Sequence, residues 1–123
     1  MTASAEAVEL TQAAAKAASD KLAEDIVALD VSAQLVITDV FLLCSARNER
    51  QVGAVVDAVE EALAKLGAKP LRREGEGQNR WVLLDYGDLV VHVQLAEERI
   101  HYAIERLWKD CPRVPLPEEQ ASA

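Results

Sequence analysis

The sequence predicts an α/β domain in which a mixed sheet of about five strands is flanked by helices. Apolar residues alternate along several strand-length segments, and two other segments have the spacing of amphipathic helices. The length of 123 residues suits one domain, and the 50% of hydrophobic residues can build its core. We therefore expect an alanine-rich N-terminal helix (1–24), a central domain (25–111) and a disordered tail (112–123).

The first part of the chain predicts one helix followed by two strands. Residues 4–23 are rich in alanine, the best helix former, but contain few large apolar side chains. We expect this helix to hold the rest of the domain weakly. Residues 25–31 and 40–45 have the patterns of strands, and in the first the more buried face is predicted to be that of Val27, Leu29 and Val31.

The middle of the chain contains the clearest helix signal. Asn48, followed three residues later by Gln51, is typical of a capping box in its looser form. Gly67 then provides a left-handed end to the helix. Between them one apolar stripe has helical spacing, and it consists of Val52, Val55, Val56, Val59, Leu63 and Leu66.

The last part of the chain predicts three strands and a helix. A short strand is expected near residues 71–74, and strands 80–86 and 89–95 are joined by a tight hairpin at Gly87-Asp88. A single helix is predicted over 97–108. Its apolar face would consist of Ile100, Ala103, Ile104, Leu107 and Trp108.

The charge balance restricts the kinds of partner. The chain has 21 acidic and 13 basic residues, a net charge of −8. Such a protein lacks the basic surface that a general nucleic-acid binder or an anionic membrane requires, so a charged partner should be basic. We expect no membrane span and no secretory signal. Cys44 and Cys111 lack metal or redox spacing, which favours reduced thiols in a cytoplasmic protein.

Residue patterns for catalysis are weak. The only histidines are His92 and His101, and Ser45 lacks the flanking glycines of a nucleophile elbow. Asp85 and Asp88 place two carboxylates at the hairpin, where they could hold magnesium for nucleotidyl transfer, although turn chemistry explains them equally well. We expect no catalytic residue, metal or cofactor. The alternative function is that of a nucleotidyltransferase-like enzyme or nucleotide-binding module.

The hairpin also has the composition of a protein–protein contact. Trp81 begins a strand directly after a polar loop, and Asp85 lies on the same face of that strand. An exposed tryptophan beside carboxylates would suit a hot spot for a basic surface. Trp81 could equally well fill the space between the sheet and a helix, and the pattern does not decide between the two.

Several motifs occur in an order that resembles the ribosomal silencing factor (Iojap) family. The resemblance covers about residues 20–111, and the chain's two ends look like those of actinobacterial members. The motifs are 25–31 (DIVALDV), 37–39 (ITD), 44–45 (CS), 50–52 (RQV), 80–88 (RWVLLDYGD), 90–93 (VVHV) and 105–108 (ERLW).

This resemblance implies a nucleotidyltransferase-like fold without its catalytic carboxylates, and a non-enzymatic role. Members of the family bind the large ribosomal subunit through its protein number fourteen and block joining of the small subunit, which represses translation when nutrients are short. They can be homodimers. The resemblance implies that Trp81 makes the ribosomal contact, with Asp85, Tyr86, His92 and Asp39 as further candidates for the binding surface or its support.

The chain departs from the family pattern at three positions. Val40 stands where an aromatic residue or cysteine is usual, and Ala46 stands where a glycine is common. Gln94 occupies a position that is often aromatic. We expect local repacking over 40–47 and an unchanged hairpin motif.

Overall fold

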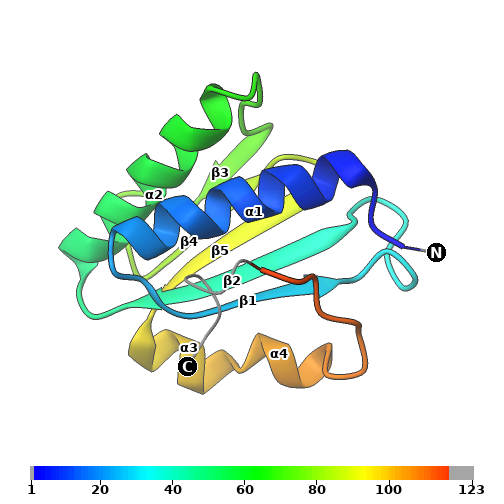
Figure 1. Ribbon diagram of the computed structural model, residues 1–123. Coiled ribbons are helices and arrows are strands. Elements are labelled where there is room, and N and C mark those ends of the chain that lie inside the picture. The colour runs from blue at the N-terminus through cyan, green and yellow to red at the C-terminus, as the bar shows by residue number, and fades with distance from the viewer. Residues whose placement is uncertain (1, 117–123) are drawn as a thin grey trace.

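A five-stranded sheet lies at the centre of the molecule, with helices on both of its faces (Figure 1). The computed structural model describes residues 2–116. The strands follow the order β1-β2-β5-β4-β3. They are β1 (Glu24–Asp30), β2 (Val40–Ala46), β3 (Arg72–Glu74), β4 (Trp81–Asp85) and β5 (Leu89–Leu95).

The sheet is mixed, as predicted. β2 and β5 pair in parallel, whereas the other three neighbouring pairs are antiparallel. The predicted hairpin joins β4 to β5, and the Tyr86 amide donates to the Leu89 carbonyl 2.8 Å away across the turn. The α/β fold class is therefore confirmed. The likeness to nucleotidyltransferases stays a prediction.

Two long helices cover one face of the sheet, α1 (Ala5–Asp20) and α2 (Glu49–Ala64) (Figure 1). The predicted cap of α2 is present, because the Asn48 side chain accepts a hydrogen bond from the Gln51 amide at 2.8 Å. The predicted stripe is buried from Val52 to Leu63, but Leu66 lies beyond the last turn and is 47% exposed. Gly67 has the left-handed backbone expected after a helix (φ 82°).

The expectation that the N-terminal helix holds the domain weakly is wrong. α1 packs on α2 and on the sheet, and the alanines on its inner side have no exposed surface. Small side chains let the helix axis approach its neighbours closely, so the absence of large apolar residues does not prevent tight packing. The fully buried alanines are Ala7, Ala14, Ala15 and Ala18.

The predicted division of β1 into a more and a less buried face is also wrong. Val27 and Leu29 are buried on the face away from α1 and α2, where they pack with Ile104, as expected. Ile26 and Ala28 are equally buried on the face that α1 and α2 cover. Because helices cover both faces of the sheet, both side-chain sets of the strand leave water.

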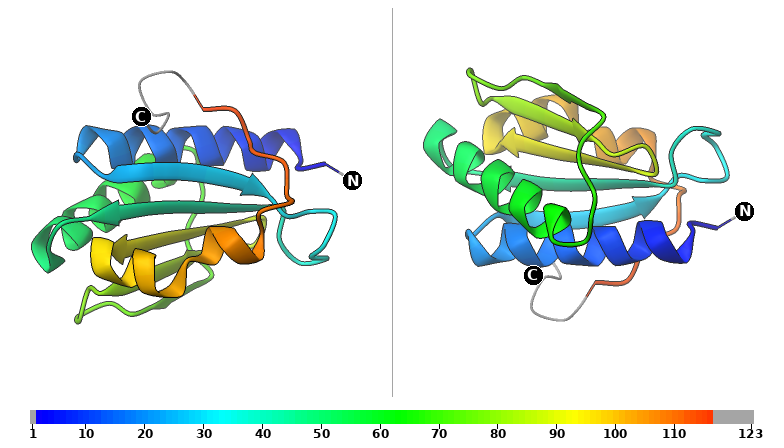
Figure 2. Two further views of the ribbon diagram at one scale, coloured as in Figure 1. Left: turned by 90° about the horizontal axis from the view of Figure 1, so that it is seen from below. Right: turned by 90° about the horizontal axis from the view of Figure 1, so that it is seen from above.

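The single helix predicted over 97–108 is divided in two. α3 (Ala96–Tyr102) and α4 (Ile104–Leu107) lie across the face opposite α1 and α2 (Figures 1 and 2). Ala103 has a left-handed backbone (φ 45°) and interrupts the helical hydrogen bonds. The predicted apolar face is therefore lost: Ile104 is buried, whereas Ile100 and Leu107 are about four-fifths exposed.

The segment 112–116 lies along β1, where the sequence predicts a disordered tail. The Pro112 carbonyl accepts from the Asp30 amide at 2.7 Å, and the Val114 amide donates to the Ala28 carbonyl at 2.9 Å. Val114 joins the buried core. The segment thus shields the outer edge of the sheet. Residues 117–123 of the expected tail lie outside the described residues. Within residues 2–116, every helix is too short or too polar to cross a membrane.

Candidate functional site

Trp81, the central residue of the predicted site, begins β4 and is only partly buried. Its backbone is fixed by the preceding loop. Gly75 has a left-handed backbone (φ 84°), and a Cβ at this position would lie 2.0 Å from the Trp81 carbonyl oxygen. A side chain at residue 75 would therefore displace the start of β4, so the loop approaches the strand closely only because glycine stands there.

The Trp81 indole contacts two other aromatic side chains. Its Nε1 donates a hydrogen bond to Nδ1 of His92 over 3.1 Å. In the register of the β4–β5 pair, Leu83 lies opposite His92, which places His92 diagonal to Trp81 on the same face. On the other side Tyr102, the last residue of α3, packs on the indole with ring centroids 4.8 Å apart.

His92 is buried and uncharged at neutral pH. Burial and, to a smaller extent, the positive charge of Arg99 together lower its pKa from 6.5 to about 4. Because Nδ1 accepts the hydrogen bond from Trp81, we assign the ring proton to Nε2. Nε2 is buried and has no hydrogen-bond partner among the described residues. His92 is therefore an acceptor for Trp81 and is not a metal ligand or an accessible base.

Two further aromatic residues extend this cluster. Phe41 on β2 contacts the rings of both His92 and Trp108 edge-on, at centroid distances of 5.3 and 5.4 Å. We call Trp81, His92, Tyr102, Phe41 and Trp108 the aromatic cluster. Sequence reasoning missed Tyr102 and Phe41. Tyr102 gives no periodic signal because the helix ends at it, and Phe41 resembles any other strand residue.

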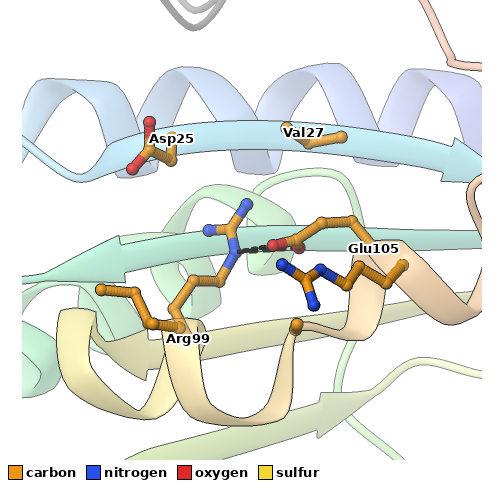
Figure 3. Close-up of a pocket in the computed structure, with 7 residues that line it drawn as sticks. Asp25, Val27, Arg99 and Glu105 are labelled. Atoms are coloured by element: carbon orange, nitrogen blue, oxygen red, sulfur yellow. Dashed lines mark hydrogen bonds and ion pairs between the residues drawn. The ribbon is translucent and has the colours of Figure 1, made fainter.

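An ion pair between a buried arginine and a partly exposed glutamate supports α3, the helix that carries Tyr102. Arg99 is 7% exposed and its Nε donates to both carboxylate oxygens of Glu105 at 3.0 Å, while the Glu105 side chain is 32% exposed. This pair connects α3 to α4 across the break at Ala103. Both side chains line a cavity of about 410 Å³, which is also bordered by Asp25 and Val27 of β1. Figure 3 shows the ion pair and these two residues.

Asp85 shares the face of Trp81, as predicted, but its described contacts are those of a turn residue. Its carboxylate accepts from the Gly87 amide at 2.8 Å and lies 3.7 Å from the guanidinium of Arg72. These contacts fit the turn explanation for the hairpin carboxylates. Within residues 2–116 no group of three or more His, Cys, Asp or Glu could hold a metal ion.

Tyr86 does not join Trp81. It follows β4 and packs against the core on the side of α1 and α2. Its hydroxyl is buried with no hydrogen-bond partner among the described residues. Burial and the negative charge of Glu60 raise its pKa to about 12. The two aromatic residues of the hairpin motif thus lie on opposite faces of the sheet.

Asp39 connects three parts of the chain. Its carboxylate accepts from the Ser4 amide at 2.9 Å, just before α1, and its own amide donates to the Asp88 carbonyl at 3.0 Å. It therefore joins the start of β2 to the hairpin and to the N-terminus. A supporting role fits these contacts, and its contact with a partner stays a prediction.

Both cysteines are free thiols and both are buried. Burial raises the pKa of Cys44 to about 12, so its thiol stays protonated at neutral pH. The Cys111 sulfur accepts a hydrogen bond from the Gln34 side chain at 3.6 Å. These environments are structural and give neither residue the character of a nucleophile.

Comparison with known proteins identifies the family. Residues 4–123 match the family described as "Ribosomal silencing factor during starvation". The chain belongs to the ribosomal silencing factor family. It is 44% identical over 108 residues to the ribosomal silencing factor of Halalkalibacterium halodurans, covering 88% of this chain and 92% of that protein. It is 41% identical over 103 residues to that of Bacillus subtilis, covering 84% and 87%.

Two solved structures have the same fold. A Bacillus halodurans protein superposes with a TM-score of 0.77 at 42% identity, covering 88% of this chain and 98% of that one. A Chromobacterium violaceum protein superposes with a TM-score of 0.79 at 35% identity, covering 82% and 84%. The resemblance inferred from the ordered motifs is therefore confirmed, and it extends to the N-terminal helix.

Proposed function

We propose that this protein represses translation by binding the large ribosomal subunit at its protein number fourteen and sterically blocking the small subunit. In this proposal it acts in the cytoplasm when nutrients are short, as a non-enzymatic factor. Membership of the ribosomal silencing factor family supports ribosome binding and regulation of translation. The particular subunit protein and the steric mechanism are what the family resemblance implies.

One structural observation supports the place of contact most strongly. Trp81 is a large aromatic residue that remains partly exposed on the less covered face of the sheet, beside the half-exposed Tyr102. Tryptophan and tyrosine are the residue types enriched in the energetically dominant parts of protein interfaces. On the opposite face, which α1 and α2 cover, Tyr86 is also partly exposed, but its side chain packs against the core and its hydroxyl is buried.

Charge supports a protein partner over RNA. The net charge of −8 opposes approach to ribosomal RNA, because affinity for phosphates depends on cationic groups that release counterions. A basic ribosomal protein would instead attract this acidic chain. In that encounter Asp85 would help to steer the partner, while Trp81 would lose its remaining water at the centre of the contact.

The proposal assigns different roles to the predicted residues. Trp81 contacts the ribosomal protein, while His92 lies beneath the surface and holds the indole. Asp39 and Tyr86 maintain the hairpin from other directions. Self-association of this chain stays a prediction of the family resemblance.

Subunit joining in vitro tests the proposed function. Purified large subunits are incubated with saturating protein, small subunits are added, and whole ribosomes are measured by sucrose-gradient sedimentation. We expect fewer whole ribosomes and co-sedimentation of the protein with the large subunit. Unchanged joining at saturating protein would reject the proposal. An unfolded sample of the same chain controls for nonspecific effects.

A further inference from the structure

The Trp81–Tyr102 pair exposes aromatic ring surface, but the indole N–H of Trp81 is not free to donate a hydrogen bond to a partner. The indole Nε1 already donates to His92, so this N–H is unavailable to a partner. What the indole still offers is its ring surface. The Tyr102 ring packs on it at a tilt of 44° and is itself 49% exposed, so the two rings form one accessible aromatic surface.

Carboxylates gather at the edge of this surface. Arg80, the residue before Trp81, forms an ion pair of 2.8 Å with Glu98 on α3. Glu97 and Glu49 are also close enough to raise the pKa of Arg80, after the larger effect of Glu98. The Arg80–Glu98 pair and Glu97 of α3 thus bring two carboxylates and one guanidinium to the start of β4, next to Trp81 in the chain.

An exposed ring face with carboxylates near its edge suits a cation. The face of an indole or phenol ring carries negative electrostatic potential and attracts ammonium and guanidinium groups. Guanidinium also stacks flat on aromatic rings while donating to carboxylates at the ring edge. An anion such as a phosphate would be repelled by the same carboxylates.

We propose that the Trp81–Tyr102 pair binds an arginine or lysine side chain of the ribosomal protein partner, and we call this pair the cation site. Tyr102 is then a second contact residue beside Trp81. His92 is a positioning residue, because it fixes the indole so that its ring and not its N–H faces the partner. This inference rests on the proposed function and specifies the chemistry of the same site.

Neighbouring side chains of the same chain hold the Trp81 and Tyr102 rings in place. His92 is a residue of β5 and pairs with Leu43 of the neighbouring β2, and the Phe41 ring lies edge-on to it at 5.3 Å. Tyr102 is the last residue of α3, and the Arg99–Glu105 pair holds the turn that follows it. The cation site is therefore formed before the partner binds, which reduces the conformational entropy lost on binding.

The main test compares two substitutions of Tyr102. Tyr102→Leu removes the ring and Tyr102→Phe keeps it, and Tyr102 is exposed enough for both proteins to fold. For Tyr102→Leu we expect about a tenfold loss of affinity for large subunits and for the isolated protein number fourteen, as loss of a cation–π contact implies. Tyr102→Phe should bind within about twofold of the wild type. Equal affinity of Tyr102→Leu and wild type would overturn the inference.

A second comparison tests the role of His92. His92→Leu removes the acceptor for the Trp81 N–H, whereas His92→Gln can replace it with an amide oxygen. In NMR spectra the Trp81 indole proton should exchange faster with water in His92→Leu, and large-subunit affinity should fall. His92→Gln should recover both properties. Slow indole exchange in a folded His92→Leu protein would contradict the positioning role, and if that variant does not fold, the Tyr102 comparison still decides the inference.

A peptide titration separates this inference from the proposed function. The wild type is titrated with a capped peptide containing one arginine and, as a control, with the same peptide containing glutamate. NMR signals of the Trp81 and Tyr102 rings should move with the arginine peptide only. If large subunits do not bind but the arginine peptide does, the proposed ribosomal function is rejected and the cation site is supported. If neither peptide moves these signals, or if free RNA moves them instead, the cation site is rejected.

Discussion

The two faces of the sheet differ in what covers them. α1 and α2, each of 16 residues, seal one face with aliphatic side chains and alanines. α3 and α4, of 7 and 4 residues, cover the other face, whose side chains include a histidine, a buried arginine and several aromatic rings. The β4 strand shows the contrast within one segment, since Val82 and Leu84 are fully buried while Trp81 and Leu83 are not.

This difference separates stability from recognition. The sealed face removes most apolar surface from water and so supplies the larger share of the hydrophobic stabilisation. The less covered face keeps large rings near the surface, where a partner can complete their burial. Side chains that bind a partner cannot also be fully buried within their own fold, because contacts already made in the free protein add no free energy of binding.

The largest effect is expected from adjacent leucines of β4 that point to opposite faces. Leu84→Ala leaves a cavity on the sealed side and should lower the free energy of unfolding by about 3 kcal/mol. Leu83→Ala, on the less covered face, should lower it by about 1 kcal/mol because Leu83 is only partly buried. Urea unfolding measures both. Equal losses would show that the two faces contribute equally to stability.

The next effect concerns pH. The pKa of His92 is about 4 in the folded protein and 6.5 when unfolded, so between these values the unfolded chain binds more protons. Stability is therefore greatest above pH 6.5 and decreases as the pH falls towards 4, by roughly 3 kcal/mol for this group. Urea unfolding at a series of pH values measures the loss.

His92→Gln is the matched control for this pH dependence. The variant retains His101 and all the carboxylates of the wild type, so the difference between the two curves isolates His92. We expect the variant to lose less stability than the wild type as the pH falls from 6.5 to 4. Parallel curves would mean that His92 is accessible to protons in the folded state.

Trp81→Ala should separate binding from folding. Because the ring is only partly buried, we expect the variant to fold, while its affinity for the large subunit falls by about 2 kcal/mol, or about 30-fold. Co-sedimentation with large subunits measures binding, and circular dichroism checks folding. A variant that unfolds would identify Trp81 as a core residue and would remove the main support for the proposed contact.

The smallest effect is expected at Asp85. Asp85→Asn keeps an acceptor for the Gly87 amide but weakens the partly exposed pair with Arg72, a change of less than about 1 kcal/mol in stability. Loss of one steering charge should reduce the association rate with the large subunit by about twofold and leave the dissociation rate unchanged. Stopped-flow mixing at low salt measures both rates. A marked increase in dissociation would place Asp85 within the contact itself.

Local sequence rules predict much of the fold. The five strands, the hairpin at Gly87-Asp88 and the cap of α2 at Asn48 all follow from patterns within a few residues. The predictions that failed concern tertiary packing. Burial of both faces of β1 and the tight packing of α1 depend on what lies above each segment, which periodicity does not report.

The break at Ala103 shows a second limit of sequence reasoning. Alanine favours helix and rarely takes a left-handed backbone, so residue 103 gave no sign of an interruption. The ion pair of Arg99 with Glu105, six residues apart, is visible only in the folded chain. For the site, Trp81 and His92 are in contact, whereas the strand pattern gave no reason to add Tyr102, whose place depends on that break.

Site-specific photo-crosslinking tests most directly whether the less covered face meets the large subunit. A photoreactive residue is placed at Leu83 beside Trp81, or at Glu61 on the exposed side of α2, and each protein is irradiated while bound to large subunits. From position 83 we predict a crosslink to protein number fourteen of that subunit, with none from position 61. Crosslinks from position 61 alone would contradict the account.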